Sequence, residues 1–146
     1  MFNEGDRRML NGIGVAAIAR YSLPESKDAY YVRERGNGYV VGFAGKNIYI
    51  SGETDAIPEM KELRGIDIAF ISMNVPYLMD AKKAAETVLE FKPGIVYPYD
   101  YRGRDVSDFK TIVNEGDKAI DVRLKNWYPS STITSSATTP ASTASK

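Results

Sequence analysis

Two short apolar runs separated by an amphipathic segment constrain the fold of this chain more than any other feature. The runs, Ile66 to Met73 and Ile95 to Tyr99, have the nearly continuous apolar character of strands that are covered on both faces. Between them, Asp80 is placed to cap a helix and Lys92-Pro93-Gly94 ends it. The apolar positions of this segment recur on one helical face, at Ala81, Ala84, Ala85, Val88 and Leu89. The order strand, helix, strand predicts an α/β fold.

The first third of the chain has the pattern of β-hairpins. Asn11-Gly12 is a strong two-residue turn signal between two apolar segments. A second turn signal, Ala44-Gly45-Lys46, lies between two further segments of strand character. The strands that these turns join are expected near Arg8, at Ile13 to Tyr21, at Tyr39 to Phe43 and at Asn47 to Ser51.

Two shorter helices and a last strand complete the pattern. The helices are predicted at Pro58 to Leu63, with proline in the first turn, and at Val106 to Val113, after Asp105. The last strand is predicted at Ala119 to Leu124. Strands that are first paired by hairpins and then separated by helices predict a mixed sheet with helices packed on one face. The opposite face of that sheet needs a cover.

Gly36-Asn37-Gly38 has the composition of a phosphate-binding loop but lies in the wrong context for one. It precedes a predicted strand rather than a helix, so no helix N-terminus is available to hold an anion. A tight turn is therefore expected here.

Composition limits both the number of domains and the chemistry. The chain of 146 residues is 43% hydrophobic, which is enough for one core. Residues 1–129 are expected to form the domain, whereas residues 130–146 are rich in Ser, Thr and Ala and are expected to be a disordered tail. No leader sequence or long apolar run is recognisable, so a soluble cytoplasmic protein is expected.

The charged and catalytic residue types exclude several classes of function. Nineteen basic and nineteen acidic residues cancel, so neither nucleic acid nor an anionic membrane surface is expected as a partner. The chain has no cysteine and no histidine, which excludes thiolate sites, Ser-His-Asp catalysis and zinc sites built on imidazole. Any chemistry depends on carboxylates, Tyr, Lys or Ser.

Several short motifs, taken in order, resemble those of a known superfamily. They are Gly36-Asn37-Gly38-Tyr39-Val40, Asn47 to Asp55, Pro58-Glu59-Met60, Asp67 to Phe70 and Lys92 to Tyr101. Together they resemble the C-terminal half of metallo-β-lactamase-fold hydrolases, in the branch of uncharacterised and lactonase-like members. The resemblance covers about Glu4 to Pro129 and implies one half of an αββα sandwich, in which two sheets pack face to face with helices outside.

The sequence departs from this family at the positions that hold metal. The family's early His-x-His-x-Asp-His motif belongs to an N-terminal half that this sequence does not contain. The family pattern Gly-Asp-Thr is Gly52-Glu53-Thr54 here, and Pro-Tyr-His-Tyr is Pro98-Tyr99-Asp100-Tyr101. A third histidine position falls at Tyr30 or Tyr31, and a neutral phenol is a poor metal ligand.

The resemblance therefore leaves Glu53 and Asp100 as weak metal candidates, with Tyr99 and Tyr101 as candidate substrate-binding residues. The family uses zinc or another divalent metal, but no cofactor is expected for this chain. One hypothesis is an inactive, truncated domain, a pseudoenzyme that acts as an interaction module by self-association or by binding the missing N-terminal half. The other is a hydrolase with an altered carboxylate site, or with a site completed by a partner chain.

Overall fold

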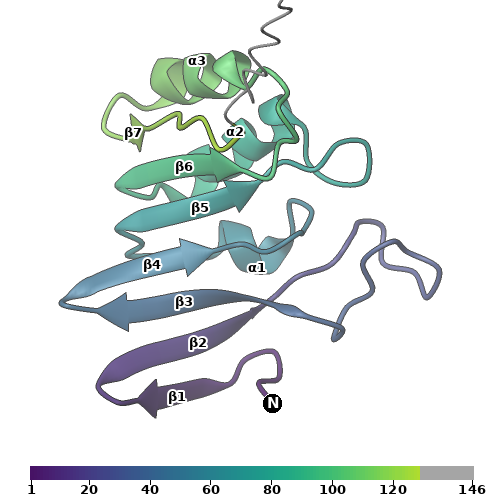
Figure 1. Cartoon of the computed structure of the whole chain (residues 1–146), viewed down its shortest axis with the longest axis vertical. Coiled ribbons are helices and arrows are strands. Elements are labelled where there is room, and N and C mark those ends of the chain that lie inside the picture. The colour runs from purple at the N-terminus through teal and green to yellow at the C-terminus, as the bar shows by residue number, and fades with distance from the viewer. Residues whose placement is uncertain (129–146) are drawn as a thin grey trace, which may run out of the picture.

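The sheet runs through the whole domain in the order of the sequence. The computed structural model describes residues 1–128 (Figure 1), so the predicted tail at 130–146 lies outside the described residues. Its seven strands form one sheet in the order β1-β2-β3-β4-β5-β6-β7. The strands are β1 (Arg7–Leu10), β2 (Ile13–Ala19), β3 (Asn37–Phe43), β4 (Lys46–Ile50), β5 (Ile68–Ser72), β6 (Ile95–Tyr99) and β7 (Asp121–Val122).

The first four strands form the predicted antiparallel hairpins. Asn11 and Gly12 turn the chain between β1 and β2, and both have positive φ (49° and 83°). Ala44 and Gly45 do the same between β3 and β4 (50° and 74°). Two successive residues with positive φ are the geometry of a tight hairpin turn whose twist matches that of the strands. Both hairpins that the sequence predicts are confirmed.

The last four strands are parallel and are connected by helices. α1 (Pro58–Lys61) lies between β4 and β5, α2 (Ala81–Phe91) between β5 and β6, and α3 (Ser107–Gly116) between β6 and β7. Asp80 caps α2 as predicted, because its carboxylate accepts a hydrogen bond from the Lys83 amide at 2.8 Å. The predicted mixed sheet with helices on one face is confirmed.

The structure corrects some of the predicted boundaries. Asn37 and Gly38 begin β3 and are not part of a tight turn. A side chain at Gly38 would place its Cβ 2.6 Å from the carbonyl oxygen of Ser51, so glycine here serves close strand packing. The last strand is also shorter than the predicted Ala119 to Leu124, because only Asp121 and Val122 pair with β6.

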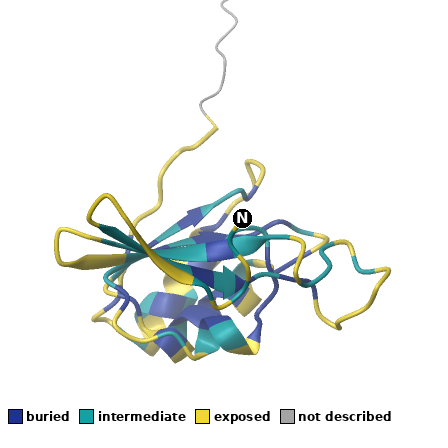
Figure 2. Ribbon diagram, turned by 90° about the horizontal axis from the view of Figure 1, so that it is seen from below, coloured by how far each residue is buried: buried dark blue, intermediate teal, exposed yellow. Residues whose placement is uncertain are grey.

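The core lies between the sheet and the helices. Figure 2 shows the buried residues concentrated in this layer. The sheet contributes Tyr49, Ala69, Ile71 and Val96, and the helices contribute Met60, Ala84, Val88, Phe91, Phe109 and Val113. α2 ends at Phe91 with Lys92 as its C-cap, which confirms the predicted stop at Lys92-Pro93-Gly94. The Phe91 ring packs edge-on against Tyr49 at 6.0 Å. This contact fixes the last turn of α2 against the sheet.

The other face of the sheet carries a second set of apolar side chains. Strand alternation and register align them in two rows that cross the sheet, with Val15, Val41, Ile48, Ile68 and Ile95 in one and Tyr39, Ile50, Phe70 and Tyr97 in the other. We call this surface the open face. Among residues 1–128, no helix packs on it, and Ile50 is 40% exposed.

A long loop from Arg20 to Gly36 is fixed to the domain by polar contacts. Arg33 forms ion pairs with Glu4, Glu25 and Glu59, and its guanidinium lies 4.8 Å from the centre of the Tyr21 ring. These contacts hold the N-terminus, the loop and α1 together. None of the helices within 1–128 is long and apolar enough to cross a membrane.

Asp55 is the buried carboxylate that ties this loop to α2. Its oxygens accept hydrogen bonds from the backbone amides of Leu23 at 3.3 Å and Ala56 at 2.9 Å, and Lys83 Nζ lies 2.6 Å away. The side chain is 7% exposed. An acceptor that serves three donors in a buried position is difficult to replace.

We expect Asp55→Asn to lower the free energy of unfolding by roughly 1–3 kcal/mol, because the amide nitrogen cannot accept and leaves at least one donor unpaired. Urea unfolding followed by circular dichroism measures the change. Asp28→Asn is the matched control, since Asp28 lies exposed in the same loop. Equal stability of the two variants would show that the Asp55 contacts do not stabilise the domain.

Candidate functional site

Polar side chains gather where the central parallel strands end. Glu53 follows β4, Asn74 follows β5 and Asp100 follows β6. Because β4, β5 and β6 are parallel, their carboxyl ends meet at one edge of the sheet. The candidate residues Glu53 and Asp100 therefore belong to the same edge, which we call the carboxyl edge.

Glu53 is held by groups from three different segments. Asn74 Nδ2 donates to its Oε1 at 3.1 Å, and Arg20 Nη1 donates to its backbone carbonyl at 3.2 Å. Tyr31 lies beside the carboxylate: burial raises the pKa of the Tyr31 phenol from 10.0 to about 12, and the neighbouring Glu53 adds to this rise. Tyr31 is therefore a neutral hydrogen-bond donor at physiological pH.

Asp100 projects from a strained position at the end of β6. Its φ is 51°, a left-handed conformation that Asp and Asn tolerate better than most side chains. The buried Ser72 hydroxyl donates to its Oδ2 at 3.3 Å. Burial raises the pKa of Tyr99, and the negative charges of Asp100 and Glu53 also act in this direction. Both carboxylates thus act on the same phenol.

Asn74 is a site residue that the sequence analysis missed. It is fully buried, and among residues 1–128 its Oδ1 has no hydrogen-bond partner, although its Nδ2 donates to Glu53. Its position directly after a buried parallel strand was the available signal, because such positions meet at the carboxyl edge. A buried acceptor without a donor is costly, so this atom suits a cation or a hydrogen-bond donor from outside the described residues.

The residues at the carboxyl edge do not fit a dinuclear zinc centre. In the part of the chain from residue 1 to 128, no three His, Cys, Asp or Glu side chains come together to hold a metal ion. The available donors are two carboxylates, an amide oxygen and hydroxyl groups, which suit Mg²⁺ or Ca²⁺ better than zinc.

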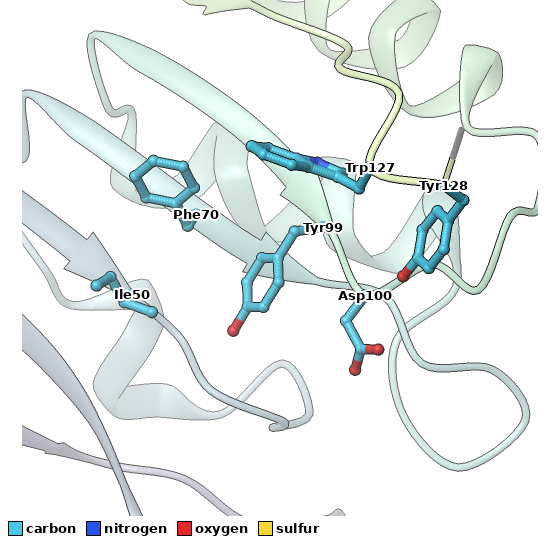
Figure 3. A pocket seen from close by; sticks show the side chains of 6 residues that line it. All are labelled: Ile50, Phe70, Tyr99, Asp100, Trp127 and Tyr128. Carbon is cyan, nitrogen blue, oxygen red and sulfur yellow. The ribbon is translucent and has the colours of Figure 1, made fainter.

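A cavity of about 550 Å³ opens beside Asp100 at one end of the open face. It is lined by Ile50, Phe70, Tyr99, Asp100, Trp127 and Tyr128. In Figure 3 the rings of Phe70, Trp127 and Tyr128 surround Tyr99. Of the two candidate substrate-binding residues, Tyr99 lines this cavity. Tyr101 is buried, and its hydroxyl donates to the carbonyl of Lys125 at 2.6 Å.

Comparisons with known proteins identify the fold. No family model matches the sequence. A UPF0173 metal-dependent hydrolase from Pyrococcus abyssi is 36% identical over 121 residues, which are 77% of this chain and 53% of the relative. The crystal structure of a protein assigned as a metal-dependent hydrolase, from Parabacteroides distasonis, superposes with a TM-score of 0.79 at 37% identity and covers 86% of this chain and 56% of that one.

A more distant structure supplies the name of the fold. An assigned zinc-dependent hydrolase of the metallo-β-lactamase superfamily, from Thermotoga maritima, superposes with a TM-score of 0.62 at 14% identity, over 84% of this chain and 70% of that chain. The chain belongs to the metallo-β-lactamase-fold hydrolase superfamily. The family resemblance predicted from the sequence motifs is thereby confirmed.

The match to this superfamily is partial in length. The chain spans about half the length of the Pyrococcus and Parabacteroides relatives, 53% and 56%. The assignment of the chain to the C-terminal half, and of Glu53 and Asp100 to substituted ligand positions, remains a prediction.

The buried phenol of Tyr31 gives the domain a testable pH dependence. Its folded-state pKa of about 12 lies above the ordinary value of 10.0, so the unfolded chain ionises first as the pH rises. The contribution of Tyr31 to stability is therefore complete below pH 10 and is lost between pH 10 and 12.

We expect the free energy of unfolding of Tyr31→Phe to decline less steeply than that of the wild type over this alkaline range. Urea unfolding at a series of pH values from 8 upward measures the slopes. Part of the decline should persist in the variant, since burial and the bond to Glu59 also raise the pKa of Tyr21 to about 12. Identical slopes would place the Tyr31 hydroxyl in water, away from Glu53.

Proposed function

We propose that this chain is a half-domain of a metal-dependent hydrolase that has no catalytic metal centre of its own and acts as an interaction module. The observation that carries this proposal is the donor set of the carboxyl edge. Glu53 and Asp100 stand there with Asn74 and the neutral Tyr31, and the chain has no histidine to complete a zinc site.

The contacts of Glu53 support the same proposal. A zinc ligand is normally oriented by second-shell groups that leave its metal-facing oxygen free. Here Oε1 already accepts from Asn74, and the side chain is one methylene longer than the aspartate of the family pattern. Positions in such a site tolerate errors of only about 0.5 Å, so a longer side chain disfavours the original geometry.

The open face supports the second part of the proposal. Its two rows of aliphatic and aromatic side chains extend across β2 to β6. Monomeric proteins seldom expose continuous apolar patches larger than a few hundred Å². Either a second copy of the chain or a separate half-domain with an apolar sheet face fits this surface.

A second candidate function is a hydrolase with an altered carboxylate site. One observation favours it, namely that no group within residues 1–128 pairs with the buried Oδ1 of Asn74, next to Glu53. Glu53, Asp100 and this amide oxygen would then bind Mg²⁺, Mn²⁺ or Ca²⁺ weakly, and the ion would supply Lewis acidity and activate water. A partner chain that carries histidines could instead complete the site.

We expect the purified protein to bind zinc no more tightly than micromolar and to hydrolyse no lactam, lactone or phosphodiester. Calorimetric titration and metal analysis after dialysis measure the binding. Stoichiometric zinc that survives dialysis would contradict the proposal, whether or not activity accompanies it.

Weak binding of Mg²⁺, Mn²⁺ or Ca²⁺ would favour the second candidate if it depends on the carboxyl edge. In that case Glu53→Gln and Asp100→Asn should each abolish it, whereas Asp117→Asn should not. Asp117 is the control because it follows α3 and pairs with Lys92, outside the carboxyl edge. Equal losses in all three variants would indicate diffuse attraction of cations to surface charge.

The open face leads to a prediction about association. We expect the protein to be a dimer or a larger species at micromolar concentration, as measured by size exclusion with light scattering. Ile48→Asp, in the middle of the open face, should shift the protein to monomer because it buries an unpaired charge in the interface.

Met9→Asp is the matched control. Met9 lies opposite Gly14 in the β1–β2 pair, so its side chain is on the face of the sheet away from Val15 and the open face. It is 71% exposed, and the variant should therefore associate like the wild type. Circular dichroism checks that both variants fold. A monodisperse wild-type monomer at high concentration would contradict self-association.

A further inference from the structure

The cavity at the end of the open face has a wall that is fixed by directed hydrogen bonds. The segment Lys125–Tyr128 lies beyond the last strand, yet Trp127 Nε1 donates to the Pro98 carbonyl at 2.8 Å. Tyr101 donates to the Lys125 carbonyl at 2.6 Å, and the Arg102 amide donates to the Tyr128 hydroxyl at 3.2 Å. The Trp127 and Tyr128 rings are thus held in place before any ligand binds, which lowers the entropic cost of binding.

The lining of this cavity combines aromatic faces with a single charged group. Phe70, Tyr99, Trp127 and Tyr128 supply the rings, Ile50 is aliphatic, and Asp100 is the charged side chain among the lining residues. The faces of aromatic rings attract cations, and they do so more strongly where water is partly excluded. Asp100 lies next to these rings, below Tyr128 in Figure 3. The cavity therefore favours a positively charged ligand with an apolar body.

Asp100 keeps acceptor capacity for such a ligand. Ser72 donates to its Oδ2 at 3.3 Å, and its Oδ1 accepts no hydrogen bond from residues 1–128. The neighbouring Tyr99 experiences the negative charges of both Asp100 and Glu53. An ammonium group placed between Asp100 and the rings would be stabilised by the carboxylate and by cation–π attraction, whereas a carboxylate ligand would be repelled.

We propose that this cavity binds a small organic ammonium ion whose body is aromatic or aliphatic. The ammonium group pairs with Asp100, and the body packs against Phe70 and Trp127. This site requires neither a metal ion nor a partner chain, so it goes beyond the function proposed above and can be tested separately from it.

The protein offers a direct signal for this test, because Trp127 is its single tryptophan and lines the cavity. The probes are phenethylamine, phenethyl alcohol and 3-phenylpropionate, which share one ring and differ in charge. Each is titrated in the presence of EDTA while Trp127 emission is recorded at 295 nm excitation. We expect phenethylamine to bind at least tenfold more tightly than either of the other two compounds.

Two carboxylate variants distinguish the charge of Asp100 in the cavity from the negative charge of the rest of the protein surface. Asp100→Asn should remove the preference for the amine while the binding of phenethyl alcohol persists, since asparagine accepts the same left-handed backbone. Asp108→Asn should retain the preference, because Asp108 is exposed in the first turn of α3. Phe70→Leu should weaken all three probes by removing a ring from the wall.

The titrations are repeated in Ile48→Asp, so that self-association does not obscure the result. Equal affinity for the amine and the acid would overturn the proposal, as would an emission spectrum that none of the probes changes. Emission that shifts only with protein concentration would show that a second copy covers the cavity. Binding that EDTA abolishes and Mg²⁺ restores would assign the site to a metal ion instead.

Discussion

Packing of the helices on one face of the sheet is the constraint on which the rest of this structure depends. Tyr49, Ile71 and Val96 are buried against Met60, Val88 and Phe109, and this layer is the main hydrophobic core of the described domain. β4, β5 and β6 run parallel, an arrangement that needs crossover connections such as α1 and α2. Their carboxyl ends consequently meet at one edge, and this brings Glu53, Asn74 and Asp100 to a common site.

The same packing leaves the other side of the sheet without a helix over it among residues 1–128. Alternation along each strand places Ile48, Phe70 and Tyr97 there because their neighbours Tyr49, Ile71 and Val96 face the helices. The match covers only 53% and 56% of the Pyrococcus and Parabacteroides relatives. The apolar sheet face and the match to only about half of each relative agree with each other. Both motivate the proposed role as an interaction module.

The carboxyl edge combines oxygen donors with aromatic rings. Glu53 is engaged by Asn74, burial raises the pKa of Tyr31, and Asp100 lines a cavity together with aromatic rings. Oxygen donors and aromatic faces both favour cations, although cations of different kinds. The second candidate function places a metal ion at this edge, and the further inference places an organic ammonium ion there. Both ligands are cations of different chemical classes.

The sequence by itself determined the hairpins, the helix that Asp80 caps and the strands around it, because turn chemistry, capping and apolar periodicity act over a few residues. The order of its short motifs also carried the resemblance to the superfamily. It also excluded histidine chemistry outright. Only the tertiary structure decided that Gly38 lies against the Ser51 carbonyl and that Trp127 and Tyr128 complete a cavity beside Asp100. It alone also decided that Asn74 binds Glu53 while its Oδ1 has no partner in the described part of the chain. These contacts join residues that are far apart in the chain, and their geometry depends on strand register and side-chain packing, which no local pattern specifies.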